Sequence, residues 1–210
     1  MSENTFEIEG FRFNVPEYYQ RVPSEPEDPA GSIPLVVQTG QAYCVVLAHH
    51  IGEDQRMPYD QGTVIDAVHG FLQENQGLVE VEAGMLDGKP YVYTIVKNLL
   101  MEGDMCQGAL YILSMDIAAD DGATHFQGQF EEIGTTGMRD ALIGELCRRE
   151  NLITITDEGI QGWNEDPYDP EWKRGALMNL SEKADYDGMF PEHPLSLARA
   201  FAGCVLGKMR

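Results

Sequence analysis

The chain has 210 residues, and its 14 lysine and arginine residues against 35 aspartate and glutamate residues give a formal net charge of −21. With 43% hydrophobic residues it has the composition of a globular protein with one sizeable core and an appendage. The negative charge repels phosphate backbones and anionic lipids, which argues against nucleic-acid and membrane partners. The opening residues lack the pattern of a secretion signal, and no run reaches the roughly 18 apolar residues of a membrane span. We therefore expect a cytoplasmic protein.

The cysteines predict neither a disulfide framework nor a zinc site. Cys44, Cys106, Cys147 and Cys204 are scattered, and no two of them form a C-x-x-C pair. Cys44 lies in an alternating run and Cys147 beside an apolar helical stripe, so both are expected to be small core residues. Nothing in the sequence calls for a metal or a cofactor.

The first fifty residues predict two hairpins. Apolar residues alternate on both sides of Glu9-Gly10, which is typical of a tight turn between short strands. After a proline-rich loop, two β-branched runs follow at 33–39 and 42–51, and Gly40 with Gln41 forms the turn between them.

A helix and a strand meander are expected next. Apolar residues at helical spacing over 64–72 predict the helix, with Thr63 as its cap and Gly77 as its exit. Four β-rich runs separated by short turns then predict strands that pair with their sequence neighbours, because no room is left for a crossover helix. These runs are 78–86, 90–100, 109–118 and 124–133.

A second helical stripe follows the meander, from Met138 to Leu146. It begins after Thr135 or Thr136, and the two arginines that follow it suit the carbonyl end of a helix. The order of elements predicts an α+β protein: a three-layer sandwich in which an antiparallel sheet has a helix on each face. We assign this sandwich to residues 1–150 and treat residues 151–210 as a C-terminal extension.

The order and lengths of these elements resemble the Mog1/PsbP-like fold, which also occurs in DcrB-type bacterial proteins. In that fold a short hairpin, paired strands, a helix, a meander and a final helix follow one another. The resemblance covers roughly residues 5–150 and implies the same three-layer α/β/α architecture. It implies no particular activity, because the fold carries unrelated functions.

The C-terminal extension is rich in aromatic rings. Both tryptophans of the chain, Trp163 and Trp172, lie in it, and this content is too apolar for a disordered tail. We expect the extension to be ordered and docked on residues 1–150. Pro194 suits the first position of a final helix, with His193 as its cap, and Leu197, Phe201 and Val205 recur at helical spacing.

Part of the extension resembles the closing segment of a group of uncharacterised bacterial proteins, from which no activity can be carried over. The matching strings are Asn179-Leu180-Ser181, Tyr186-Asp187, Phe190-Pro191 and His193-Pro194-Leu195-Ser196.

Tests for catalytic patterns are negative. Residues 84–89 approach a phosphate loop but are one residue short and lie between strands, which indicates a hairpin turn. No glycine-flanked serine suggests a nucleophile elbow. His49 and His50 are adjacent in a strand and face opposite sides, so they cannot hold one ion together. Asp116 either borders a buried layer, where desolvation would raise its pKa, or is a strand-end carboxylate that reaches water or a turn amide.

The leading functional hypothesis is a non-enzymatic interaction protein. It would be an adaptor or chaperone-like module that presents a sheet face, a groove or its tail to a protein partner, and the acidic surface would favour a basic partner. The candidate contact residues are Trp163, Tyr168, Trp172, Tyr186, Phe190 and His193.

Two alternatives stay open. One is a small-ligand binder or an enzyme with a pocket between the sheet and the extension, lined by Tyr91, Tyr93, Asp116 and His193. The other is a homo-oligomer in which the aromatic extension packs on a second copy. No catalytic residue and no metal ligand is assigned.

Overall fold

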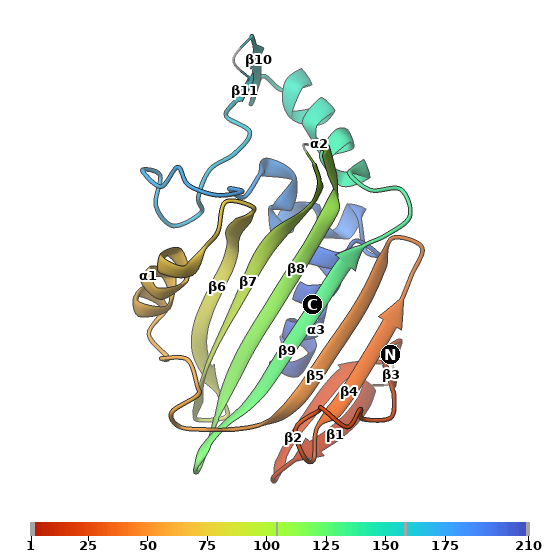
Figure 1. Ribbon diagram of the computed structural model, residues 1–210, viewed down its shortest axis with the longest axis vertical. Helices are drawn as coiled ribbons and strands as arrows, with labels where there is room; N and C mark the ends of the chain where they lie inside the picture. Colours follow the sequence, from red (N-terminus) through yellow and green to blue (C-terminus); the bar gives the residue numbers. More distant parts are fainter. Residues whose placement is uncertain (1–2, 104, 158, 209–210) are drawn as a thin grey trace.

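The computed structural model describes residues 3–103, 105–157 and 159–208 (Figure 1). Its main feature is a seven-stranded antiparallel sheet with the strand order β3-β4-β5-β9-β8-β7-β6. The predicted α+β class, with an antiparallel sheet between helices, is confirmed. The strands of this sheet are β3 (Gln20–Arg21), β4 (Ile33–Gln38), β5 (Ala42–Gly52), β6 (Gln76–Leu86), β7 (Lys89–Glu102), β8 (Met105–Ala119) and β9 (Gly122–Glu132).

Strands β6 to β9 form the predicted meander. Each pairs with its neighbour in sequence, since the turns between them are too short for a crossover. Strand β5 then pairs with β9 and carries β4 beside it, which is the second predicted hairpin. The first predicted hairpin, β1 (Glu3–Ile8) with β2 (Phe11–Pro16), forms a separate two-stranded sheet.

Two helices cover the sheet unequally. Helix α3 (Pro194–Val205) lies behind the sheet in Figure 1 and supplies most of the helical side of the main core. Its Phe201 is 0% exposed, and the ring centroid lies 5.2 Å from that of Tyr19 and 6.0 Å from that of Phe126. Helix α1 (Gln61–Phe71) lies on the opposite face, where it packs against β6 and β7. On this opposite face the part formed by β6 and β7 is therefore covered, and the part formed by β8, β9, β5 and β4 is open.

The helix after the meander does not cover the sheet. Helix α2 (Met138–Arg149) lies beyond the end of the strands (Figure 1), where its buried residues pack against the extension rather than against a sheet face. The second covering helix is α3, which the sequence analysis assigned to the extension. The remaining elements are β10 (Thr154–Thr156), β11 (Gly159–Gln161) and the 3₁₀ turns η1 (Leu180–Glu182) and η2 (Ala184–Met189).

The helix ends agree with the predictions in part. The expected cap of α3 is confirmed, since Leu195 N–H donates to His193 Nδ1 and a proline occupies the first turn. The cap of α1 is Asp60 rather than Thr63, because the Asp60 carboxylate accepts bonds from both the amide and the hydroxyl of Thr63. Gly77 is not the exit of α1 and lies inside β6.

Gly77 is needed in the strand because the extension passes directly over it. A Cβ atom at this position would lie 1.7 Å from the carbonyl oxygen of Ala176, so any other residue would push the two segments apart. Gly77 thus allows the backbones of β6 and the extension to approach closely, whereas the sequence pattern predicted that it ends a helix.

No described cysteine forms a disulfide, and Cys44 and Cys147 are buried as predicted. None of the helices in the described residues combines the length and the apolar character needed to span a bilayer.

Replacing Phe201 with alanine tests whether α3 belongs to the core. Because the ring is fully buried against Tyr19 and Phe126, we expect the free energy of unfolding to fall by about 3–5 kcal/mol. Phe71 of α1 is 85% exposed and is the matched control, with an expected change within about 0.5 kcal/mol. Urea unfolding followed by tryptophan fluorescence measures both, and equal small losses would contradict the assignment.

Candidate functional site

The extension first crosses the edge strand β6 and helix α1. The Tyr168 hydroxyl bonds both backbone groups of Val81, accepting from its N–H at 2.5 Å and donating to its C=O at 3.1 Å. His69 of α1 lies 2.9 Å from Asp166 and stacks on Trp172 with ring centroids 4.3 Å apart. These contacts fix the first part of the extension on the sheet edge.

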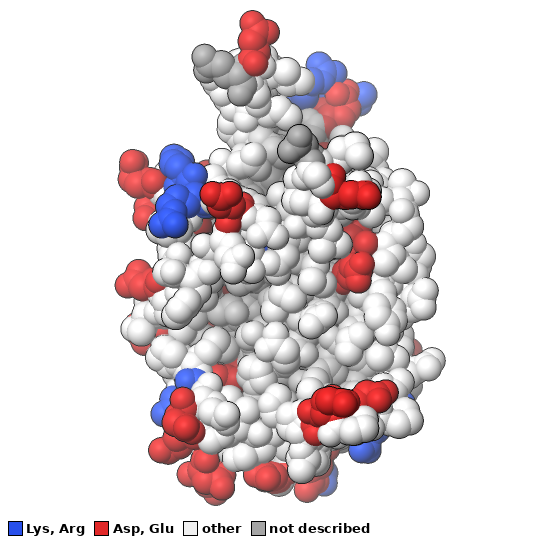
Figure 2. All heavy atoms as spheres, viewed as in Figure 1, with Lys and Arg blue, Asp and Glu red and all other residues white. Residues whose placement is uncertain are grey.

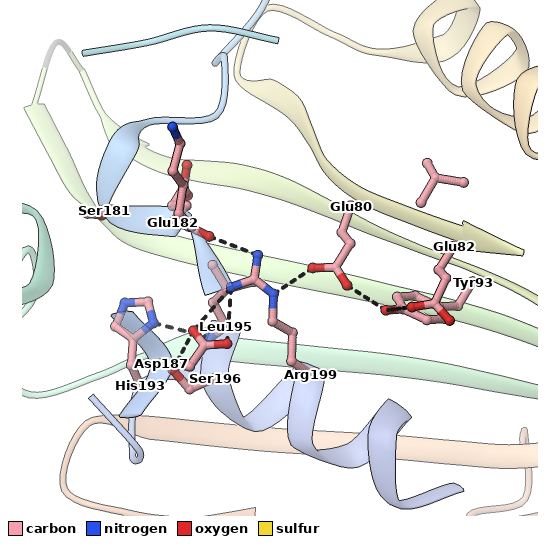
Figure 3. A network of polar contacts seen from close by, with 12 residues as sticks. Glu80, Glu82, Tyr93, Ser181, Glu182, Asp187, His193, Leu195, Ser196 and Arg199 are labelled. Atoms are coloured by element: carbon pink, nitrogen blue, oxygen red, sulfur yellow. Dashed lines mark hydrogen bonds and ion pairs between the residues drawn. The ribbon is translucent and has the colours of Figure 1, made fainter. Parts of the chain in front are cut away.

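A buried ionic network fixes the second part (Figure 3). Arg199 of α3 donates to Glu80 of β6 at 2.6 Å and to both carboxylate oxygens of Asp187 at 3.1 and 3.2 Å. Arg139 of α2, only 1% exposed, donates to Asp187 at 2.9 Å and to Ser196 at 2.9 Å. The network thus ties the sheet, α2 and α3 together through one turn of the extension.

A second buried pair extends this network into the sheet. Lys97 of β7 donates to Glu182 at 2.7 Å, and the Tyr111 hydroxyl of β8 donates to the other oxygen of the same carboxylate at 2.8 Å. Burial, together with the adjacent Glu182 charge, raises the pKa of Tyr111 well above its usual value, so the hydroxyl stays a donor. The buried carboxylate therefore has the partners that its burial requires.

His193 is held neutral beside these cations. Burial lowers its pKa to about 3, helped by the nearby Arg139 and Arg199 guanidinium groups. Because Nδ1 accepts the Leu195 amide hydrogen, the proton of the neutral ring is on Nε2.

A cavity of about 260 Å³ lies at this junction, between the end of the sheet, α2 and the extension. His193, Lys97 and Glu182 are in its lining, together with Glu132 and Asp140. Glu132 accepts the Gly137 amide hydrogen, and Asp140 accepts bonds from Asn179 and Ser181. Burial is the main cause that raises the pKa of Glu132. The cavity is a polar space in which charges of both signs meet.

The other candidate region is the part of the sheet that α1 leaves uncovered, which we call the open face. Its side chains alternate with those that face α3, so they point away from the main core. It consists of Val36 and Gln38 of β4; Tyr43, Val45, Leu47 and His49 of β5; His125, Gln127, Gln129 and Glu131 of β9; and Leu110, Ile112, Ser114 and Asp116 of β8.

The open face is almost uncharged. Its two acidic residues are Glu131 and Asp116, and Asp116 is only 1% exposed. Figure 2 shows this side of the molecule, with a neutral middle and acidic side chains gathered towards the lower and upper margins. Apolar side chains such as Ile112 and Val45 flank a central row of glutamines on β9. A neutral, half-apolar surface is unusual for a chain of charge −21.

A histidine–aspartate pair lies at one end of the open face. His125 Nδ1 is 2.6 Å from Asp116, whose other oxygen accepts the Met57 amide at 2.6 Å, and His125 Nε2 is 3.3 Å from Gln127. Both ring nitrogens are therefore engaged. The Ser114 hydroxyl donates to Gln127 and not to the imidazole, so the pair is not arranged to activate that serine.

The structure divides the predicted contact residues among three places. Trp163, Tyr186 and Phe190 pack with α2 in one apolar cluster. Tyr168 and Trp172 lie on the edge of β6 and on α1, and His193 lines the cavity. All six have partners within the chain, and their binding of a further protein or ligand stays a prediction.

The residues proposed for a ligand pocket also separate. His193 lines the junction cavity, whereas Tyr91 and Tyr93 face α3 and donate to Glu82 and Glu80. Asp116 is buried on the opposite face and bonds the amide of a loop residue, one of the two environments expected for it.

Comparison with known proteins finds similarity in structure and none in sequence. No family model matches the chain, and no curated protein matches it in sequence. The solution structure of cyanobacterial PsbP (CyanoP) from Synechocystis sp. PCC 6803 is similar, with 18% sequence identity and a TM-score of 0.38. The similarity covers 69% of this chain and 86% of that chain, and it concerns the fold alone.

The lowered pKa of His193 predicts a stability loss in acid. The unfolded chain binds a proton below about pH 6.5, whereas the folded ring does not until about pH 3, so stability falls as the pH drops through that window. We expect a slope approaching about 1.4 kcal/mol per pH unit from this residue. His193→Asn keeps a cap acceptor and has no titrating ring.

Urea unfolding of both proteins between pH 7.5 and 5.5 isolates this effect. The stability advantage of the natural protein over His193→Asn should shrink as the pH falls. A difference that does not change with pH would show that His193 is not buried as a neutral ring.

Proposed function

We propose that this protein is a non-enzymatic interaction module, of the adaptor or chaperone-like kind, which receives a protein partner on its open face. The observation that carries the proposal is the neutral, half-apolar character of this face in a chain of charge −21. A monomer that only needed solubility would place more of its many acids there, since an exposed apolar sheet face favours aggregation. The proposed binding site is the open face, and Ile112 and Gln129 lie near its middle.

The acidic margins define the partner. Glu131 lies on the face, and acidic side chains, with some Lys and Arg among them, lie at its margins (Figure 2). A second copy of this chain would bring like charges together at the rim, whereas a protein with an apolar centre and a basic rim is complementary. Attraction between opposite charges also accelerates encounter at low ionic strength. The partner is thus expected to be a basic protein, and the cytoplasm is its expected location.

Site-specific photo-crosslinking in cells tests this proposal. A photoreactive residue at Gln129, which is exposed on the open face, should capture one reproducible partner. The same residue at Leu142 on α2, which is 52% exposed and is not part of the face, is the matched control. Equal capture from both positions, or none from Gln129, would contradict the proposal.

The captured partner then permits a quantitative test. Ile112→Lys places a charge among the apolar contacts and repels a basic rim, so the affinity should fall at least about tenfold, which corresponds to about 1.4 kcal/mol. Leu142→Lys adds the same charge elsewhere and should leave the affinity unchanged. The association rate of the natural protein should fall as salt is added.

A second candidate function is binding of a small polar ligand in the junction cavity. It is favoured by the cavity of about 260 Å³ between the sheet and the extension, which includes His193. Ala109, which lines the cavity, gives a direct test. Compounds from a metabolite screen that raise the melting temperature should lose this effect in Ala109→Leu, which fills the space. A screen without any shift, or a shift that survives the substitution, would contradict this candidate.

A further inference from the structure

We propose that Glu9, His50 and Asp121 form a binding site for a divalent transition-metal ion. The three residues come from the tip of the β1–β2 hairpin, the end of β5 and the β8–β9 turn. One donor atom from each lies within 4.8 Å of the other two. The site is independent of the open face and of the junction cavity.

The geometry of His50 and Glu9 suits two ligands of one ion. His50 Nδ1 lies 3.2 Å from a carboxylate oxygen of Glu9, yet this buried nitrogen has no hydrogen-bond partner in the part of the chain that the structure describes. Two donors that bind one metal at about 2.0–2.2 Å, at angles between 90° and 110°, lie about 3.0–3.5 Å apart. The pair already has this spacing.

Asp121 completes the ligand set with little movement. Its carboxylate lies 3.6 Å from His50 Nε2, and the donor atoms of all three residues lie within 4.8 Å of one another. The Asp121 side chain is 80% exposed, so it can rotate towards the ion without disturbing the core. His50 itself is 21% exposed and holds the fixed position around which the two carboxylates move.

The donor types indicate the class of metal. One imidazole with two carboxylates suits Zn²⁺, Mn²⁺ or Fe²⁺, whereas Ca²⁺ and Mg²⁺ prefer oxygen donors throughout. The two carboxylates balance the charge of a divalent ion, and water fills the remaining positions. The net charge of −21 raises the local concentration of cations around the chain. A bound ion would tie the N-terminal hairpin to the sheet.

Titration of the chelator-treated full chain with ZnCl₂ and with MnCl₂ at pH 8 tests the site. The natural protein should bind one ion of at least one of these metals, and His50→Ala should weaken binding at least tenfold. Glu9→Gln and Asp121→Asn should each weaken it too. His49→Ala removes the neighbouring imidazole, which faces the other side of the strand, and should leave binding unchanged.

Hydrogen exchange of the β1–β2 hairpin supplies a second readout. Metal should slow exchange in the natural protein and leave it unchanged in His50→Ala. Absence of binding would overturn the proposal. Equal binding by the natural protein and His50→Ala would also overturn it and would assign metal uptake to scattered surface acids. Exchange of the hairpin that metal does not slow in the natural protein at pH 8 would also overturn it.

Discussion

The structure depends on a small set of buried charges that cannot be separated from one another. Arg139, Lys97 and Glu182 are almost fully buried, and each has its opposite charge within 2.9 Å. Removing one partner from such a pair typically destabilises a protein by about 3–5 kcal/mol, because the remaining charge stays buried without compensation. The extension is therefore held in one position, and that position places α3 against the sheet. Since α3 packs with the β1–β2 hairpin on one face and α1 packs against β6 and β7 on the other, the open face follows from the same arrangement.

The local part of the fold could be predicted from the sequence, whereas the layer arrangement could not. Alternation and short turns identify the two hairpins and the meander, because strand pairing between sequence neighbours is determined by a few adjacent residues. The role of α2 was misjudged because its apolar stripe predicts burial but not the surface that buries it. Gly77 was misread for a similar reason: its requirement comes from Ala176, about a hundred residues further along the chain.

The candidate sites show the same limit. The aromatic rings of the extension stand out in the sequence, yet Trp172 and Tyr168 serve first to attach it, through His69 and Val81. The glutamines of β9 belong to no sequence motif. Only their alternation with Phe126 and Phe130 indicates that they lie on the opposite face of the sheet from these two rings. Clusters such as Asp116 with His125 join residues of neighbouring strands, so the register must be known before they can be recognised.

The contact between Tyr168 and Val81 has a consequence for how the sheet ends. An unpaired edge strand normally exposes backbone amides and carbonyls that can pair with a strand of another molecule, which is the first step of edge-to-edge aggregation. A single phenol here occupies both groups of one residue on β6, and Ala176 takes the carbonyl of Gln76 nearby. The extension thus blocks the pairing of another strand at these positions of β6 and limits sheet extension from this edge.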